Sequence, residues 1–169
     1  REALPEERSA IAAEIRQAMA EGALGVSTGL IYNPSMFADT EELVAVSRAA
    51  AEGNGVYTTH MRHEGVQLME AVEEALEVAR RSGARTEICH LKASGKAAWG
   101  RAAEAAERIR QAREEGNDIA FDLYPYTAGS TMLSTLLPQW ALRGTTDEIV
   151  ARLRDPAAIA RLLHELRHG

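Results

Sequence analysis

Residues 56–61, VYTTHM, and residues 87–92, EICHLK, are two short segments with the β-branched and aromatic composition of strands. Two further segments follow the same period: LGVSTGL (24–30) lies one interval earlier, and IAFDLYPY (119–126) lies one interval later. A nearly constant period of roughly 31 residues indicates that one structural unit is repeated along the chain. The four segments therefore predict four strands of one sheet.

Helical patterns fill the intervals around these segments, with apolar residues at helical spacing and charges on the opposite face. They cover residues 6–21, 40–52, 66–82 and 101–115. Asp39 is expected to cap the second helix, and Glu42, three positions on, to complete a capping box. A glycine follows each pattern, where a left-handed C-terminal cap is expected because only glycine adopts a positive φ without strain. These glycines are Gly22, Gly53, Gly83 and Gly116.

Strands that alternate with helices predict a parallel sheet with helical crossovers. Two architectures fit this pattern, a doubly wound open sheet and a (β/α)8 barrel. No glycine-rich phosphate-binding motif follows any strand, which disfavours the nucleotide-binding versions. A complete barrel needs about 250 residues, whereas this chain has 169 and four βα units. After Tyr126 we expect a loop, a short apolar helix and two further helices, over residues 146–154 and 156–168, with no further strand.

Composition excludes several classes of function. The net charge is −6 and the estimated pI is 5.4, so the basic face that a nucleic-acid-binding protein needs is not indicated. No apolar run approaches the length of about 18 residues that crosses a membrane. The single cysteine, Cys89, excludes an internal disulfide framework and predicts a reducing, cytoplasmic location.

Two histidines, His60 and His90, lie about one repeat apart at the ends of successive strands. Functional residues of parallel α/β folds gather at the carboxyl ends of strands, and adjacent strands lie about 4.8 Å apart. At matched positions, both imidazoles can therefore reach one metal ion. Zinc suits imidazole, but a catalytic zinc site needs three protein ligands, of which two are visible. An ordinary hydrogen-bonded histidine is the alternative interpretation of each.

Strand alternation predicts that Lys92, two residues after His90, shares its face and can hold a substrate carboxylate. Tyr124, at the end of the fourth strand, can donate a hydrogen bond to the same anion. A solvent-exposed lysine and a packed tyrosine are the structural alternatives. The same alternation predicts that Cys89 points towards the helices as a small buried side chain and not as a nucleophile. His63 is expected to lie in solvent.

Four motifs in order strongly resemble the D-aminoacylase (N-acyl-D-amino-acid deacylase) family of the amidohydrolase superfamily. They are GALGVSTGLIYNPSMFADTEEL (22–43), GVYTTHMRHEG (55–65), EICHLKASGKAAWG (87–100) and FDLYPYTAGSTMLSTLLPQWA (121–141). The resemblance implies a zinc-dependent (β/α)8 barrel that hydrolyses the amide of N-acyl-D-amino acids, small-molecule substrates. It assigns the zinc to two side chains and the substrate α-carboxylate to three: His60 and His90, and Lys92, Tyr124 and Ser130.

Other residues of the family pattern do not occur in this chain. The family's HxH pair and its metal-binding cysteine are expected upstream of Arg1, and its catalytic aspartate beyond Gly169. No catalytic residue is therefore expected within the chain. We interpret it as an internal part of a barrel, with strands four to seven of eight in residues 1–130 and a helical segment in residues 131–169.

The isolated chain is accordingly expected to bind zinc poorly, to be inactive, and to self-associate through its two unpaired strand edges. No nucleic acid or membrane is expected as a partner. Two alternatives stay open. One is a cyclic-amide hydrolase of the same superfamily, similar to dihydroorotases or hydantoinases. The other is a non-enzymatic α/β domain that binds a small carboxylate through Lys92 and Tyr124.

Overall fold

A computed structural model describes residues 1–168 and contains the predicted parallel sheet. Its sheet order is β1-β2-β3-β4, the order along the chain. The strands are β1 (Gly25–Gly29), β2 (Val56–His60), β3 (Arg85–Ile88) and β4 (Ile119–Phe121). β3 begins two residues before the predicted segment. All three pairings are parallel, so the predicted βα repeat is confirmed.

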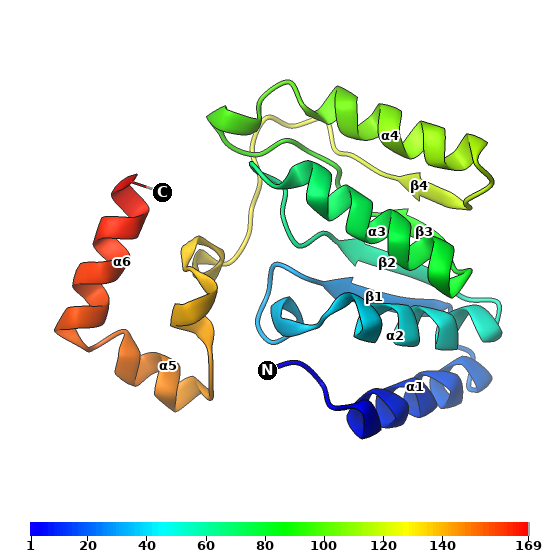
Figure 1. Ribbon diagram of the computed structural model, residues 1–169, viewed down its shortest axis with the longest axis horizontal. Helices are drawn as coiled ribbons and strands as arrows, with labels where there is room; N and C mark the ends of the chain where they lie inside the picture. The colour runs from blue at the N-terminus through cyan, green and yellow to red at the C-terminus, as the bar shows by residue number, and fades with distance from the viewer. Residues whose placement is uncertain (169) are drawn as a thin grey trace.

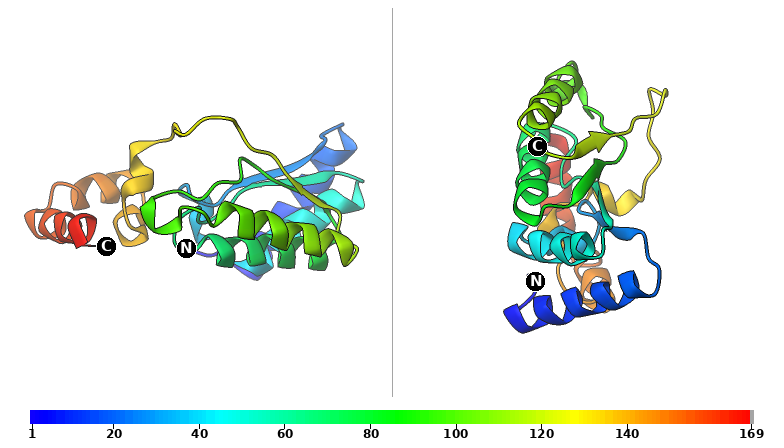
Figure 2. Two further views of the ribbon diagram at one scale, coloured as in Figure 1. Left: turned by 90° about the horizontal axis from the view of Figure 1, so that it is seen from above. Right: turned by 90° about the vertical axis from the view of Figure 1, so that its right-hand side faces the viewer.

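The four predicted helices are present, each within two residues of the expected bounds. They are α1 (Pro5–Ala20), α2 (Thr40–Glu52), α3 (Leu68–Ser82) and α4 (Ala102–Glu114). Figures 1 and 2 show that α2, α3 and α4 lie on one side of the sheet and that α1 packs beside α2. Short 3-10 turns, η1 (Ser35–Phe37) and η2 (Lys96–Ala98), lie in the loops after β1 and β3.

The core lies between the sheet and these helices. One cluster joins α3 and α4 to the sheet through Leu68, Val72 and Ile109, with Ile88 and Ile119 from the strands, each at most 1% exposed. Along β2, buried Tyr57 and Thr59 alternate with half-buried Val56, Thr58 and His60. His60 therefore lies on the face of the sheet that α2, α3 and α4 do not cover.

The prediction that a left-handed glycine follows α2 needs correction. Gly53 has a φ of −90°, and the left-handed position after α2 belongs to Asn54, with a φ of 59°. Glycine is still required at position 53, because a Cβ there would lie 2.9 Å from the Cβ of Met19. The glycines after the other three helices have the predicted positive φ, namely Gly22, Gly83 and Gly116.

Asp39 caps α2 as predicted, since its Oδ1 accepts from the amide of Glu42 at 2.8 Å. The return bond of a capping box does not form. The carboxylate of Glu42 accepts instead from the amide of Ala3 at 3.3 Å, because the chain before α1 packs against the start of α2.

The C-terminal segment differs from the sequence prediction at one place. The single short apolar helix is replaced by two 3-10 turns, η3 (Leu133–Leu136) and η4 (Gln139–Leu142). Pro138 separates them, because proline forces the preceding Leu137 into an extended conformation. The two predicted helices follow as α5 (Thr146–Arg152) and α6 (Pro156–His168).

These last two helices lie beyond the carboxyl ends of the strands (Figure 1). Pro156 is the first residue of α6, as predicted. Gly169, the last residue of the predicted helical segment, lies outside the described residues. Within residues 1–168, no helix combines the length and apolar character needed to span a membrane.

Candidate metal and carboxylate site

The imidazoles of His60 and His90 face each other at the carboxyl ends of β2 and β3. Nδ1 of His60 contacts Nε2 of His90, and the ring centroids lie 4.4 Å apart at an interplanar angle of 48°. Both side chains are half-buried. The structure therefore brings the two predicted metal ligands together, with one ring nitrogen of each facing the other.

His90 reaches this position by a route other than strand register. Thr59 pairs with Ile88, so the next position in register opposite His60 is Cys89. His90 lies one residue beyond, after the end of β3, with a φ of +44° in the left-handed region. Its amide donates to Oδ1 of Asp122 at the end of β4, which holds this turn. The prediction of matched strand positions is wrong, because this turn redirects the side chain.

Cys89 is not the buried, helix-facing side chain that strand alternation from His90 predicts. It is half-buried, and it follows Glu87 in the alternation with buried Thr86 and Ile88. Its amide donates to the Thr59 carbonyl at 2.9 Å, which continues the strand ladder by one residue. Burial raises the pKa of its thiol, and the nearby carboxylates add to the effect. The thiolate needed for nucleophilic chemistry is therefore disfavoured.

Lys92 and Glu64 surround the far side of the His90 ring. Nζ of Lys92 lies 2.6 Å from Nδ1 of His90 and 2.6 Å from Oε1 of Glu64. The same carboxylate oxygen lies 2.9 Å from Nδ1 of His90. Glu64 comes from the loop between β2 and α3, and its side chain is only 16% exposed. Strand alternation does not explain the position of Lys92, since β3 has already ended.

Glu64 was not identified from the sequence. The available signal was a carboxylate four residues after His60 in the loop that leaves β2. Loops at the carboxyl ends of parallel strands line the functional site, so an acidic residue there was a candidate. Spacing along the chain does not distinguish Glu64 from a solvent-exposed glutamate, because the conformation of the loop decides where the Glu64 side chain points.

Tyr124 and Lys92 line a groove of about 600 Å³ together with Trp99, Tyr126 and Gly129. Nζ of Lys92 lies 5.6 Å from the centroid of the Tyr124 ring. A Cβ at Gly129 would lie 3.2 Å from the Tyr124 hydroxyl, so glycine leaves that hydroxyl uncrowded. An ammonium and a phenol beside one groove are suitable donors for a carboxylate.

Ser130 is the predicted carboxylate ligand that the structure does not bring into this cluster. Its side chain is exposed, and within residues 1–168 it takes part in no hydrogen bond. It follows Gly129, the last residue that lines the groove. His63 is exposed in the loop after β2, in agreement with the sequence prediction.

The local environment favours a neutral His60. Burial lowers the pKa of its imidazole, and the neighbouring His90 ring lowers it further. Metal binding requires the neutral form of histidine. The desolvated position of His60 therefore suits a metal ligand near neutral pH.

The donor set fits zinc in part. Two converging imidazole nitrogens are suitable zinc ligands, and a catalytic zinc site takes three protein ligands. Within the described part of the chain, no group of three or more His, Cys, Asp or Glu side chains is placed to hold a metal. His60 and His90 are therefore candidates for two of the three ligands.

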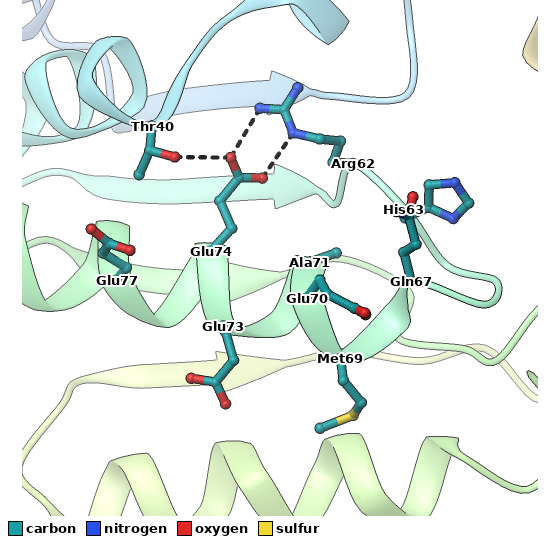
Figure 3. Close-up of a pocket in the computed structure, with 10 residues that line it drawn as sticks. All are labelled: Thr40, Arg62, His63, Gln67, Met69, Glu70, Ala71, Glu73, Glu74 and Glu77. Carbon is teal, nitrogen blue, oxygen red and sulfur yellow. Dashed lines mark hydrogen bonds and ion pairs between the residues drawn. The ribbon is translucent and has the colours of Figure 1, made fainter. Parts of the chain in front are cut away.

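Arg62, two residues after His60, anchors the loop that carries Glu64. Its guanidinium forms two hydrogen bonds with Glu74 of α3, at 2.9 and 3.0 Å. Figure 3 shows Glu74 held between Arg62 and Thr40 at the edge of a second groove. Arg62 also donates to the carbonyls of Met36 and Ala38, each at 2.8 Å. This network ties the loops after β1 and β2 to α3.

No protein-family model matches the chain. Two curated relatives come from Alcaligenes xylosoxydans xylosoxydans. The chain is 41% identical over 133 residues to a D-aminoacylase, and 40% identical over 127 residues to an N-acyl-D-glutamate deacylase. The matches cover 79% and 75% of this chain but 27% and 26% of the relatives. The chain therefore spans about a quarter of the length of the curated relatives it matches.

Solved structures of proteins with the same two names are also similar to this chain. A D-aminoacylase studied for its binuclear metal centre superposes with a TM-score of 0.76 at 41% identity, over 81% of this chain and 29% of that protein. An N-acyl-D-glutamate deacylase from Bordetella bronchiseptica, complexed with zinc and a phosphonate inhibitor, gives 0.72 at 36% identity, over 75% of this chain and 27% of that protein. The four βα units thus form part of an amidohydrolase barrel.

Proposed function

We propose that this chain, which belongs to the D-aminoacylase family of amidohydrolases, forms part of a zinc-dependent enzyme that hydrolyses N-acyl-D-amino acids. The observation that carries this proposal is the convergence of His60 and His90 beside the groove of Lys92 and Tyr124. The relatives are deacylases of linear amides, which favours this substrate class over cyclic amides. In this proposal residues 1–130 supply strands four to seven of the barrel, and residues 131–169 follow the last of them.

Two side chains would hold the zinc, His60 through Nδ1 and His90 through Nε2, with the remaining ligands from outside residues 1–168. Zinc, when bound, polarises the scissile carbonyl and increases the acidity of a coordinated water. Asp122 keeps His90 in its left-handed turn, and burial lowers the pKa of His60, which favours its neutral form. The chain itself thus orients one imidazole and favours the metal-binding form of the other.

Lys92 and Tyr124 would bind the α-carboxylate of the substrate in the groove, and Ser130 is the third donor that the family resemblance assigns to it. An anchored carboxylate fixes the position of the α-carbon relative to the metal. With the carboxylate and the amide both held, the two enantiomers differ only in which side of the α-carbon carries the side chain. Selectivity for D-amino acids then requires, besides this anchoring, a surface that accepts the side chain on one side only.

Hydrolysis of N-acetyl-D-methionine tests the proposal. The full-length product of the gene that encodes this chain is expected to hydrolyse the D substrate faster than the L enantiomer, and to lose activity on zinc removal. Full activity after verified removal of all metal, or equal rates on both enantiomers, would contradict the proposal. The isolated 169-residue chain is expected to be inactive and to elute as oligomers, because β1 and β4 each pair on one side only among the described strands.

Replacing Lys92 by methionine is expected to lower kcat/KM about 10- to 100-fold, mainly through KM. A hydrogen bond to a charged group contributes about 1.5–3 kcal/mol, and a carboxylate held equally in ground and transition states affects KM. Lys96→Met is the matched control, since Lys96 is exposed in η2 four residues later. Equal KM values for the two variants would remove Lys92 from the substrate site.

A further inference from the structure

We propose that Tyr32 is a positioning residue for substrate binding, because its hydroxyl holds Thr131 and thereby fixes the neighbouring Ser130 at the edge of the carboxylate groove. This role rests on the proposed function, in which Ser130 is a donor to the α-carboxylate of the substrate. Tyr32 would contribute from the loop after β1, at the opposite edge of the sheet from the strand that leads to Ser130.

The segment after β4 crosses the carboxyl side of the sheet to reach Tyr32. β1 and β4 are the outer strands of the described sheet, and Tyr32 follows β1 whereas Thr131 follows β4. Figure 1 shows this segment passing from β4 to the level of β1. The Tyr32 hydroxyl lies 3.0 Å from Oγ1 of Thr131, and Nδ2 of Asn33 donates to the carbonyl of Leu142 at 3.1 Å. Two hydrogen bonds therefore tie the loop after β1 to the segment after β4.

The half-buried Tyr32 ring is held in place at the end of β1. Its amide donates to the carbonyl of Gly29 at 3.0 Å, and its carbonyl accepts from the amide of Met36 at 2.7 Å. A Cβ at Gly29 would lie 2.8 Å from Cδ2 of the Tyr32 ring, so glycine lets this ring pack directly on the backbone of β1. Contacts on the backbone and on the ring thus fix the direction of the Tyr32 hydroxyl.

Ser130 lies between two residues that each approach a tyrosine hydroxyl. On one side, a Cβ at Gly129 would lie 3.2 Å from the hydroxyl of Tyr124, the predicted carboxylate donor. On the other side, Thr131 is hydrogen-bonded to Tyr32. Consecutive Cα atoms are about 3.8 Å apart, so Ser130 stays beside the groove as long as Thr131 is held. The exposed Ser130 hydroxyl takes part in no hydrogen bond within residues 1–168 and is available to a ligand.

Steady-state kinetics of the full-length protein with N-acetyl-D-methionine test this role. Tyr32→Phe and Thr131→Val are each expected to raise KM about 3- to 10-fold, as for the loss of one neutral hydrogen bond, with kcat within about twofold. Thr131→Ser keeps the hydroxyl and is expected to retain the wild-type KM. Thr146→Val is the matched control, because Thr146 is exposed and its hydroxyl has no hydrogen bond within residues 1–168. KM values of Tyr32→Phe and Thr131→Val equal to that of Thr146→Val would overturn the proposal.

Double-mutant cycles show whether Tyr32 acts through Thr131 and Ser130. The variant with both Tyr32→Phe and Thr131→Val is expected to raise KM no more than either single replacement. In a Ser130→Ala background, neither replacement is expected to raise KM further. Effects that multiply in either cycle would show that Tyr32 acts independently of the Ser130 segment, and would overturn the proposal.

Limited proteolysis at the exposed Met132 and Leu133 tests the tie without relying on activity. Cleavage there is expected to be about 3- to 10-fold faster in Tyr32→Phe and Thr131→Val than in wild type and Thr146→Val, because proteases cut the locally opened form. Equal cleavage rates in all four proteins would overturn the tie. If the wild type hydrolyses no N-acyl-D-amino acid but the two variants are cut faster, the proposed function fails and the tie of Tyr32 to the Ser130 segment stands.

Discussion

Replacing His60 or His90 by alanine is expected to lower the zinc affinity of the full-length protein by more than about 100-fold and to abolish its hydrolytic activity. Loss of a residue that only orients a ligand costs about 10- to 100-fold, and loss of the ligand itself removes a direct bond. The two imidazoles contact each other, so each single replacement breaks the pair. Metal content after dialysis and competition with a chelator measure the effect.

His63→Ala is the matched control for this experiment. His63 lies in the same loop, three residues after His60, but its side chain is exposed. Its replacement is expected to leave zinc affinity within a factor of about two, as for an ordinary surface substitution. A loss of zinc in His63→Ala equal to that in His60→Ala would show that general disturbance of the loop, and not ligand loss, is responsible.

Replacing Arg62 by alanine is expected to lower the free energy of unfolding by about 2–3 kcal/mol, because the variant leaves a mostly buried carboxylate without its charged partner. The guanidinium and the Glu74 carboxylate are 25% and 17% exposed. Removing one member of a buried pair costs about 3–5 kcal/mol, and the remaining exposure reduces this figure. Two carbonyls, of Met36 and Ala38, also lose their donors. The shift of the urea unfolding midpoint of the full-length protein measures the effect.

Arg110→Ala provides the comparison. Arg110 pairs with Glu107 and Glu114 on α4, but it is 55% exposed, and such surface pairs contribute at most about 1 kcal/mol. Glu74→Gln, which removes the charge and keeps a hydrogen-bond acceptor, is expected to be intermediate. Equal destabilisation by Arg62→Ala and Arg110→Ala would contradict the structural role of the Arg62 network. A loss of zinc affinity in Arg62→Ala would extend that role to the loop of Glu64.

The repeated elements were predictable because their signals are local. The apolar spacing of α3 and the residues of β2 follow from chain periodicity, which depends only on backbone geometry. The N-terminal cap by Asp39 is likewise local, since its bond partner is three residues away. The return bond of the capping box was not predictable. Glu42 binds Ala3, 39 residues away, and a contact at that separation exists only once α1 packs beside α2.

The candidate site likewise combines features that follow from the local sequence with features that depend on tertiary contacts. The residue types and chain positions of His60, His90 and Lys92 are enough to predict a metal site and a carboxylate-binding site at the strand ends. The strand argument for their orientation was wrong at His90 and Cys89, because β3 ends at Ile88 and the turn that follows reverses the alternation. The location of these residues at the strand ends was therefore predictable, and the directions of His90 and Cys89 were not.

By itself, the sequence determined the number and order of the βα units, the family resemblance, and the residue types that bear on the chemistry. Tertiary structure alone decided the turn that directs His90 at His60, the placement of Glu64 between His90 and Lys92, and the anchoring of the Glu64 loop by Arg62 and Glu74. The physical reason is the range of the interactions. Periodicity and capping arise within one or two turns of chain, whereas the bond from the His90 amide to Asp122 spans 32 residues and exists only after the strands have paired.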